Sequence, residues 1–208
     1  MYSLPEKDEM TKGSLKDRLR RVSKRKLVLR LRPELLLGSN VPRPMHGVAP
    51  RVILGSRWWN QERQAAYRST KYHCLACGVW KHQALGRDWL EGHETYDIDY
   101  LKGQMVYVET VPLCHYCHNF IHDGRMRSLL AKGKLTHQKF TAIVQHGDSV
   151  LFAAKLSRAR FEDREDAMAD MILNGEVAPW PNWRLVLFGN KYPPKFKTEL
   201  QWQKAMSR

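Results

Sequence analysis

Apolar residues recur at helical spacing over much of the chain, and this pattern predicts mainly helical flanks. Residues 56–69 form one such stretch, in which we expect Trp58 and Trp59 to pack in a core rather than to serve as base-stacking platforms. Thr136 is expected to cap a helix that Gly147 ends, because glycine is the residue that most often follows a helix C-terminus. Further helices are predicted from Ser14 onward, over 148–160 and 163–173, and after Thr198, where Thr-x-x-Gln forms a capping box.

Strand-like alternation is confined to short runs. Residues 105–108 predict one strand, and residues 183–188 predict another that is followed by Gly189-Asn190, a hairpin signal. Glycines and prolines over 38–50 indicate a loop. Short strands between helical flanks place the chain in the α+β class.

Four regions follow from this pattern and from the motifs described below. We predict a basic N-terminal arm and helix, then a helix that leads into a small metal-binding module, then the module itself. A mainly helical C-terminal region with a hairpin completes the chain. The predicted bounds are 1–50, 51–72, 73–124 and 125–208.

Composition and charge narrow the function classes. The chain has 208 residues with a net charge of +14 and an isoelectric point near 9.8. Apolar and charged contents are those of a globular protein rather than a disordered one, and no apolar run is long enough to span a membrane. The first 13 residues lack the apolar stretch of a secretory signal, so we expect a cytoplasmic protein, within the host cell if a phage encodes it. The excess of positive charge favours a polyanionic partner, most often nucleic acid.

The charge is unevenly distributed. Residues 1–72 hold 17 basic and 6 acidic side chains, residues 73–123 hold 3 and 7, and residues 124–208 hold 15 and 8. Basic flanks suit phosphates, and an acidic centre suits a divalent cation. The densest basic run is predicted to contact nucleic acid, although a solvated helix face is the alternative reading. It consists of Arg18, Arg20, Arg21, Lys24, Arg25 and Lys26.

Four cysteines form two C-x-x-C pairs in the acidic centre. Cys74 and Cys77 make the first pair, and Cys114 and Cys117 make the second. This spacing lets two thiolates bind one tetrahedrally coordinated ion. A thioredoxin-like redox motif would need only one such pair. Disulfides are not expected in a reducing cytosol. The sequence therefore predicts a structural zinc.

The segment between the pairs carries a second group of ligand-type residues. Glu91, His93 and Glu94 lie in the run Leu-Glu-Gly-His-Glu-Thr, which precedes the second cysteine pair. If a helix begins near residue 115, His118 and His122 stand four apart on one of its faces, which is ligand spacing for a single cation. Together with His93 they predict a second metal site.

This order of residues resembles the HNH endonucleases, whose ββα-metal motif can sit inside a zinc-binding cysteine frame. The resemblance covers 74–122, about a quarter of the chain. It implies that Glu91 orients the site and that His93, His118 and His122 bind the catalytic ion, which would be Mg²⁺, Mn²⁺, Ni²⁺ or Zn²⁺. A wider likeness, carried by Trp58-Trp59 and by residues 189–196, is to phage and prophage proteins with a His-Glu version of the motif.

Two positions depart from the family pattern. Glu94 stands where the family usually places its general-base histidine, and Glu109 stands where it places the middle asparagine. Three interpretations of Glu94 remain open. It can accept the proton from water, although its ordinary pKa near 4.3 makes it a weak base; it can bind the metal; or the site can have lost catalysis.

The resemblance therefore implies a metal-dependent DNA endonuclease or nickase that hydrolyses a phosphodiester bond, with Glu94, His93 and Glu91 as catalytic residues. The alternative is an inactive zinc protein that binds nucleic acid, or a protein partner as an inhibitor or assembly factor, and a purely structural protein is a third reading. Double-stranded DNA is the expected partner, and no membrane contact is expected.

Overall fold

The computed structural model describes residues 29–38, 41–157, 175 and 177–206. The predicted helix from Ser14 and the predicted helix over 163–173 lie outside these residues. Within them the protein has mixed α and β structure, as the α+β class predicts. None of the described helices combines the length and the apolar character that a bilayer crossing requires.

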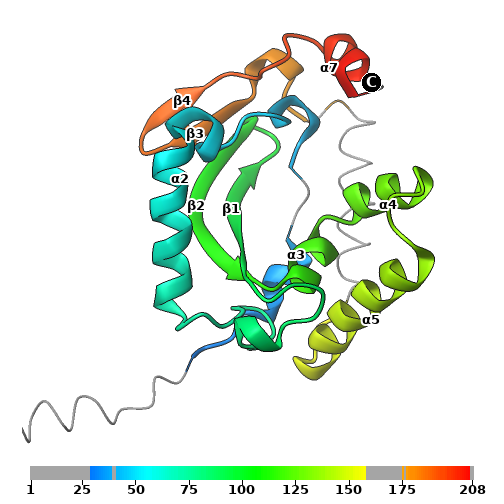
Figure 1. Cartoon of the computed structure of the whole chain (residues 1–208). Coiled ribbons are helices and arrows are strands. Elements are labelled where there is room, and N and C mark those ends of the chain that lie inside the picture. Colours follow the sequence, from blue (N-terminus) through cyan, green and yellow to red (C-terminus); the bar gives the residue numbers. More distant parts are fainter. Residues whose placement is uncertain (1–28, 39–40, 158–174, 176, 207–208) are drawn as a thin grey trace, which may run out of the picture.

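A four-stranded mixed sheet forms the centre of the molecule (Figure 1). Strand β1 (Glu91–Asp99) pairs antiparallel with β2 (Gln104–Leu113), and the register is interrupted by an irregularity between Thr95 and Tyr96. The edge of β2 then pairs in parallel with β3 (Arg184–Leu187), which forms a hairpin with β4 (Asn190–Tyr192). Both sequence-predicted strands are confirmed, but the C-terminal hairpin extends the central sheet, which local alternation did not indicate.

The two sides of the β1–β2 ribbon contact different helices. Helix α2 (Pro50–Ser69) runs along one side, where a Cβ on Gly92 would lie 3.0 Å from the ring of Trp59. Helix α3 (His115–Ile121) follows β2 directly and packs against the other side. Successive residues of β1 therefore face α2 and α3 in turn, as the alternation of a strand requires.

The remaining described elements enclose this centre. Helices α4 (Asp123–Ala131) and α5 (His137–Ala153) follow α3, and α7 (Glu199–Met206) lies near the C-terminus. Short 3₁₀ turns occupy Pro33–Leu37 (η1), Arg43–Met45 (η2), Lys81–Gln83 (η3) and Trp180–Asn182 (η4).

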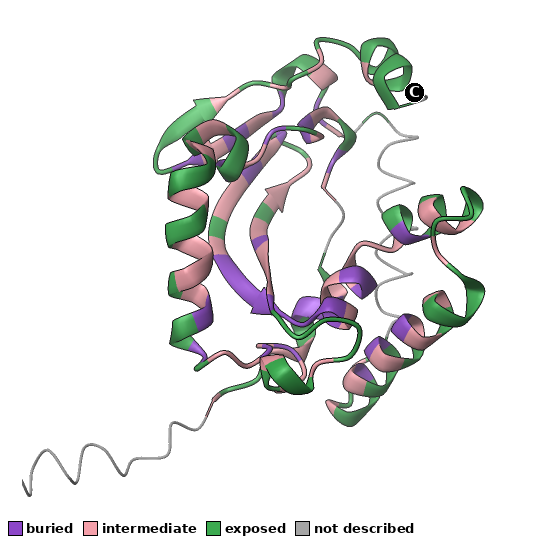
Figure 2. Ribbon diagram, in the orientation of Figure 1, coloured by how far each residue is buried: buried purple, intermediate pink, exposed green. Residues whose placement is uncertain are grey.

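Buried side chains gather in two clusters (Figure 2). One lies between η1, α3, α5 and the end of β2, where Thr110–Leu113 are all buried. The other surrounds Met105, Trp183 and Leu185, where β2 and β3 meet. The first cluster includes the cysteines, so the metal-binding frame and the core are one unit.

One predicted boundary is wrong. Helix α5 does not end at Gly147 but runs unbroken from His137 to Ala153, so the two predicted helices are one. A Cβ at position 147 would overlap the ring of Phe120 on α3, and this glycine therefore serves close helix packing rather than termination. The predicted cap at Thr136 is confirmed, since its hydroxyl accepts the Lys139 N–H at 3.2 Å.

Candidate metal centres

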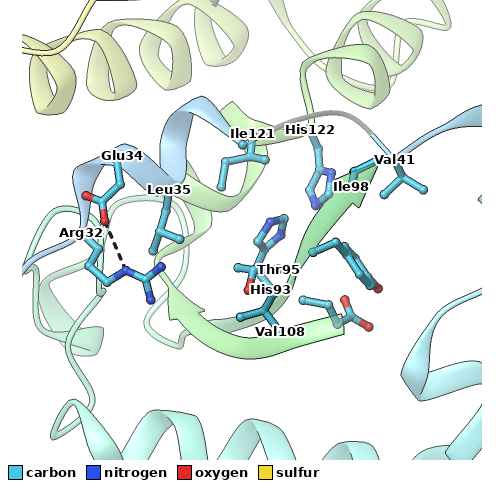
Figure 3. A pocket seen from close by; sticks show the side chains of 13 residues that line it. Arg32, Glu34, Leu35, Val41, His93, Thr95, Ile98, Val108, Ile121 and His122 are labelled. Carbon is cyan, nitrogen blue, oxygen red and sulfur yellow. Dashed lines mark hydrogen bonds and ion pairs between the residues drawn. The ribbon is translucent and has the colours of Figure 1, made fainter. Parts of the chain in front are cut away.

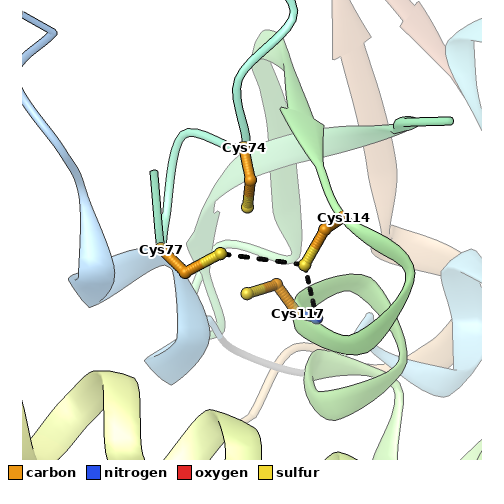
Figure 4. A group of neighbouring side chains, drawn as sticks. All are labelled: Cys74, Cys77, Cys114 and Cys117. Carbon is orange, nitrogen blue, oxygen red and sulfur yellow. Dashed lines mark hydrogen bonds between the residues drawn. The ribbon is translucent and has the colours of Figure 1, made fainter. Parts of the chain in front are cut away.

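The four cysteines converge on one point from two separate turns (Figure 4). Cys74 and Cys77 lie in a turn that Gly78 closes at a φ of 79°, a conformation that side chains disfavour. Cys114 caps α3, and Cys117 lies in its first turn. The four Sγ atoms lie within 4.8 Å of one another.

The spacing of the thiols fits a tetrahedral zinc ion. The Sγ atoms of Cys77 and Cys114 are 3.8 Å apart, and a tetrahedron with Zn–S bonds of about 2.3 Å has edges of about 3.8 Å. No disulfide joins these cysteines. The pKa of the Cys74 thiol is lowered by hydrogen bonds from Cys114 and Cys117, and that of Cys117 is raised by its contact with Cys114. The cluster can bind a structural zinc, as predicted.

Three histidines form a second group of ligand atoms. His93 on β1 and His118 and His122 at the end of α3 each offer a ring nitrogen within 4.8 Å of the others. The Nε2 atoms of His118 and His122 are 3.3 Å apart, close to the separation of about 3.4 Å for two nitrogens bound tetrahedrally at about 2.1 Å. The structure thus brings together the three histidines that the sequence analysis selected.

Glu91 lies behind the histidine group and contacts α3 twice. Its Oε2 lies 2.5 Å from His118 Nδ1, and its Oε1 lies 2.7 Å from His115 Nδ1. Burial alone would raise the pKa of Glu91, but these contacts with His115 and His118 bring it below its usual value. An ionised carboxylate at Nδ1 leaves the Nε2 lone pair of His118 directed at the other two imidazoles, as in carboxylate–histidine–metal arrangements.

Two of the histidines, His93 and His122, favour the neutral form that binds metal. Burial, followed by the nearby His118, lowers the pKa of His93 to about 3. Burial and His118 likewise lower the pKa of His122 to about 4. Imidazole ligands suit transition ions better than Mg²⁺, which prefers oxygen ligands.

Glu94 faces the opposite side of β1 from His93. Its carboxylate is 8% exposed, and its Oε2 accepts a hydrogen bond from Arg51 of α2 at 2.7 Å. Burial raises the pKa of Glu94, and the charge of Arg51 opposes that shift. Oε1 is buried and has no hydrogen-bond partner among the described residues. Glu94 is not part of the histidine ligand group, so the geometry gives no support to the interpretation that it binds the metal.

A cavity of 270 Å³ opens beside the histidine group (Figure 3). His93, Glu94 and His122 are among the residues that line it. Arg32 and Glu34 lie at another side of the cavity and pair with each other at 3.3 Å. A ligand in this cavity would lie beside the imidazoles of His93 and His122.

Glu109, which the resemblance aligns with the asparagine of the HNH motif, forms one side-chain contact and one backbone contact. Its carboxylate pairs with Arg32, and its backbone carbonyl accepts a hydrogen bond from Thr95 Oγ1 at 3.2 Å. The arginine–glutamate pair joins the segment before η1 to β2. Glu109 therefore links two segments at the rim of the site.

The contacts of several residues at the site were not predicted from the sequence. The spacing of His115 and His118 within Cys-His-Tyr-Cys-His could have indicated that both meet one partner. Arg51 and His146 gave no local signal, because their partners Glu94 and Cys117 lie 43 and 29 positions away. The six basic residues predicted to contact nucleic acid, Arg18 to Lys26, lie outside the described residues.

The histidine group thus joins β1 to α3, and the cysteine cluster joins the turn at residues 74–78 to the start of α3. No protein-family model, no curated protein and no solved structure matches this chain.

Proposed function

We propose that this protein is a metal-dependent endonuclease of the HNH type, which nicks DNA by hydrolysing a phosphodiester bond. The observation that carries the proposal is the convergence of His93, His118 and His122 at the junction of a β-hairpin and a helix. The carboxylate of Glu91 behind His118 and the adjoining cavity add support.

The catalytic divalent ion would bind at the histidine group. An ion held there would act as a Lewis acid toward a phosphate oxygen of the scissile bond. His93, His118 and His122 would hold it, and Glu91 would fix the ring of His118. The cysteine cluster would hold a separate structural zinc, which would fix the position of α3 relative to the end of β2.

Glu94 is the proposed general base. Its Oε1 is buried and has no hydrogen-bond partner among the described residues, and Glu94 is one of the residues that line the cavity. A water molecule that reaches Oε1 would therefore find an unoccupied proton acceptor. Arg51 holds the other oxygen at 2.7 Å and fixes the orientation of the carboxylate. The side chain of Arg51 is 51% exposed, so it can also approach a phosphate that enters beside Glu94.

The charge distribution supports a DNA partner. Residues 1–72 hold 17 basic and 6 acidic side chains, and nucleic acid is the common polyanionic partner of such segments. A single metal centre acts on one strand, so the expected product from a supercoiled plasmid is the nicked circle.

The deciding experiment is a plasmid-relaxation assay with Mg²⁺, Mn²⁺, Co²⁺, Ni²⁺ or Zn²⁺ added to the zinc-loaded protein. We expect nicked circles with at least one transition ion. His93→Ala should abolish them, and His82→Ala, at an exposed histidine, should not. Cleavage that persists in His93→Ala would identify a contaminating nuclease and overturn the proposal.

One observation favours a second candidate function, a non-catalytic nucleic-acid-binding protein. Glu94 is engaged by Arg51, whereas a general base must be free to take up a proton. In that case the protein would retard plasmid DNA in a gel without cutting it under any of the five ions. The relaxation and retardation assays together separate the two functions.

A further inference from the structure

One histidine outside the two ligand groups lies beside the cysteine cluster. This residue is His146, on α5. Its Nε2 lies 3.3 Å from Cys117 Sγ and 3.9 Å from Cys114 Sγ. The ring of Tyr116 packs edge-on against it, with the centroids 5.7 Å apart and the planes at 87°.

The chemistry of a zinc-bound thiolate fixes the direction of this contact. A thiolate has no proton and can only accept, so the imidazole must carry its proton on Nε2 and donate it. Four thiolates around Zn²⁺ leave about two excess negative charges. A donor at 3.3 Å from Cys117 Sγ would offset part of that charge.

The packing of α5 against α3 makes this approach possible. Glycine is disfavoured inside helices, yet Gly147 lies within α5, next to His146. A Cβ at this position would overlap the ring of Phe120 on α3. Gly147 thus permits the close approach that brings the neighbouring imidazole to the cysteines.

We propose that His146 is an outer partner of the zinc site, donating an N–H···S hydrogen bond to Cys117 and thereby tying α5 to the metal frame. This inference rests on zinc occupancy of the four cysteines and is independent of nuclease activity. It makes helix α5, which lies beyond the cysteine pairs in sequence, part of the zinc site.

The test compares zinc retention in full-length, zinc-loaded variants. His146→Leu keeps an apolar side chain of similar bulk and removes the donor, whereas His146→Gln places an amide N–H near the position of Nε2. His137→Leu, at an exposed histidine on the same helix, is the matched control. Zinc release is followed with an excess of a chromophoric chelator, and far-UV circular dichroism checks folding.

We expect His146→Leu to release zinc about 10-fold faster or more, because loss of such outer contacts costs 10–100-fold in metal affinity. His146→Gln and His137→Leu should stay within about 3-fold of the wild type. Equal release by the leucine and wild-type proteins would overturn the proposal, as would equally fast release by the leucine and glutamine variants, since packing alone would then explain the effect.

Two further measurements keep the test decisive. If His146→Leu does not fold, His146→Asn replaces it, because the shorter amide cannot reach Cys117 and should release zinc faster than the glutamine variant; equal rates would count against the proposal. In the Co²⁺-substituted protein, the thiolate charge-transfer band should have the intensity of four thiolates, and three would make His146 a direct ligand instead. A wild-type protein without zinc would remove the metal site itself, a failure distinct from that of the nuclease proposal.

Discussion

Glu91 Oε2 on β1 lies 2.5 Å from Nδ1 of His118 on α3, so a strand residue sets the orientation of a helix ligand. The other oxygen of the same carboxylate lies 2.7 Å from His115 Nδ1. One side chain of β1 therefore contacts two histidines that lie about one turn apart on α3. The orientation of His118 within the histidine group depends on this carboxylate.

Replacing Glu91 with Gln should weaken binding of the second ion. An amide has a single acceptor oxygen, so it cannot accept from both His115 and His118, and it carries no charge to increase the basicity of the ligand. We expect Co²⁺ affinity at the histidine group to fall by about 10–100-fold, measured by titration of the zinc-loaded protein.

Asp97→Asn is the matched control for that variant. It removes the same charge from the same strand at an exposed position, and Co²⁺ affinity should stay at the wild-type value. An equal loss of affinity in both variants would indicate a general effect of net charge instead of a specific contact with His118.

Glu94→Gln tests the proposed general base. The change keeps the size of the side chain and an oxygen that can face Arg51, but it removes the proton acceptor. The nicking rate should fall by about two to four orders of magnitude, the usual contribution of general-base catalysis, while affinity for uncut DNA changes little. Single-turnover nicking and gel retardation measure the two quantities.

The outcome with Glu94→His sharpens this prediction. An imidazole is better matched to proton transfer near neutral pH, so activity should be retained or increased. A glutamine variant that nicks at the wild-type rate would remove Glu94 from the mechanism and leave its pairing with Arg51 as a structural contact.

Local sequence signals predicted the metal-binding module well. The paired cysteine spacing predicted the cluster, and His118 and His122 at four-residue spacing did meet on one helix face. Such pairs can be predicted because their two ligands are separated by only three or four positions in the sequence. Only His93 had to come from elsewhere, and the hairpin of β1 and β2 supplies it.

Contacts between distant segments could not be predicted in the same way. Arg51 meets Glu94 from α2, and β3 joins the edge of β2 in parallel, although neither segment carries a pattern that specifies its partner. The helix end predicted at Gly147 is wrong for the same reason. A glycine at a helix end and a glycine at a helix crossing look alike until the facing residue, Phe120, is known.

Cys117→Ser should destabilise the whole module. Cys117 is fully buried in the core cluster, and the free energy of binding zinc contributes directly to folding in small zinc modules. We expect loss of bound zinc, measured by metal analysis, together with a lower melting temperature. Strong chelation of the wild type should reproduce the melting shift, and an unshifted melting temperature after zinc removal would contradict a structural role.

The basic N-terminal run should control the salt dependence of DNA binding. Lysine and arginine release condensed counterions when they contact phosphates, so reversing Arg20, Arg21, Lys24 and Arg25 together should flatten the slope of log affinity against log salt. Metal content should not change. An unaltered slope, measured by fluorescence anisotropy on a short duplex, would assign these charges to solubility.

His46 should make the docking of α7 sensitive to acid. Its Nδ1 accepts a hydrogen bond from Trp202 Nε1 of α7 at 3.0 Å, and its Nε2 donates to the Val41 carbonyl oxygen at 3.0 Å. The bond from Trp202 requires the neutral ring, because a protonated Nδ1 cannot accept, whereas the bond to Val41 survives protonation. Burial lowers the pKa of His46 from its ordinary 6.5, a hydrogen bond to Val41 opposes this shift, and the positive charge of Arg43 adds to it.

A lowered histidine pKa means that the unfolded chain binds the proton more readily than the folded one. The stabilising contribution of His46 is therefore complete above pH 6.5 and is lost as the pH falls from there toward its folded-state pKa. Hydrogen exchange in α7 should accelerate as the pH falls below 6.5, the ordinary pKa of histidine. His46→Gln supplies an amide donor and acceptor that do not titrate, so its exchange, after correction for intrinsic rates, should vary less with pH. Equal pH dependence in the two proteins would show that α7 is docked by other contacts, such as the Arg43–Glu199 ion pair at 3.1 Å.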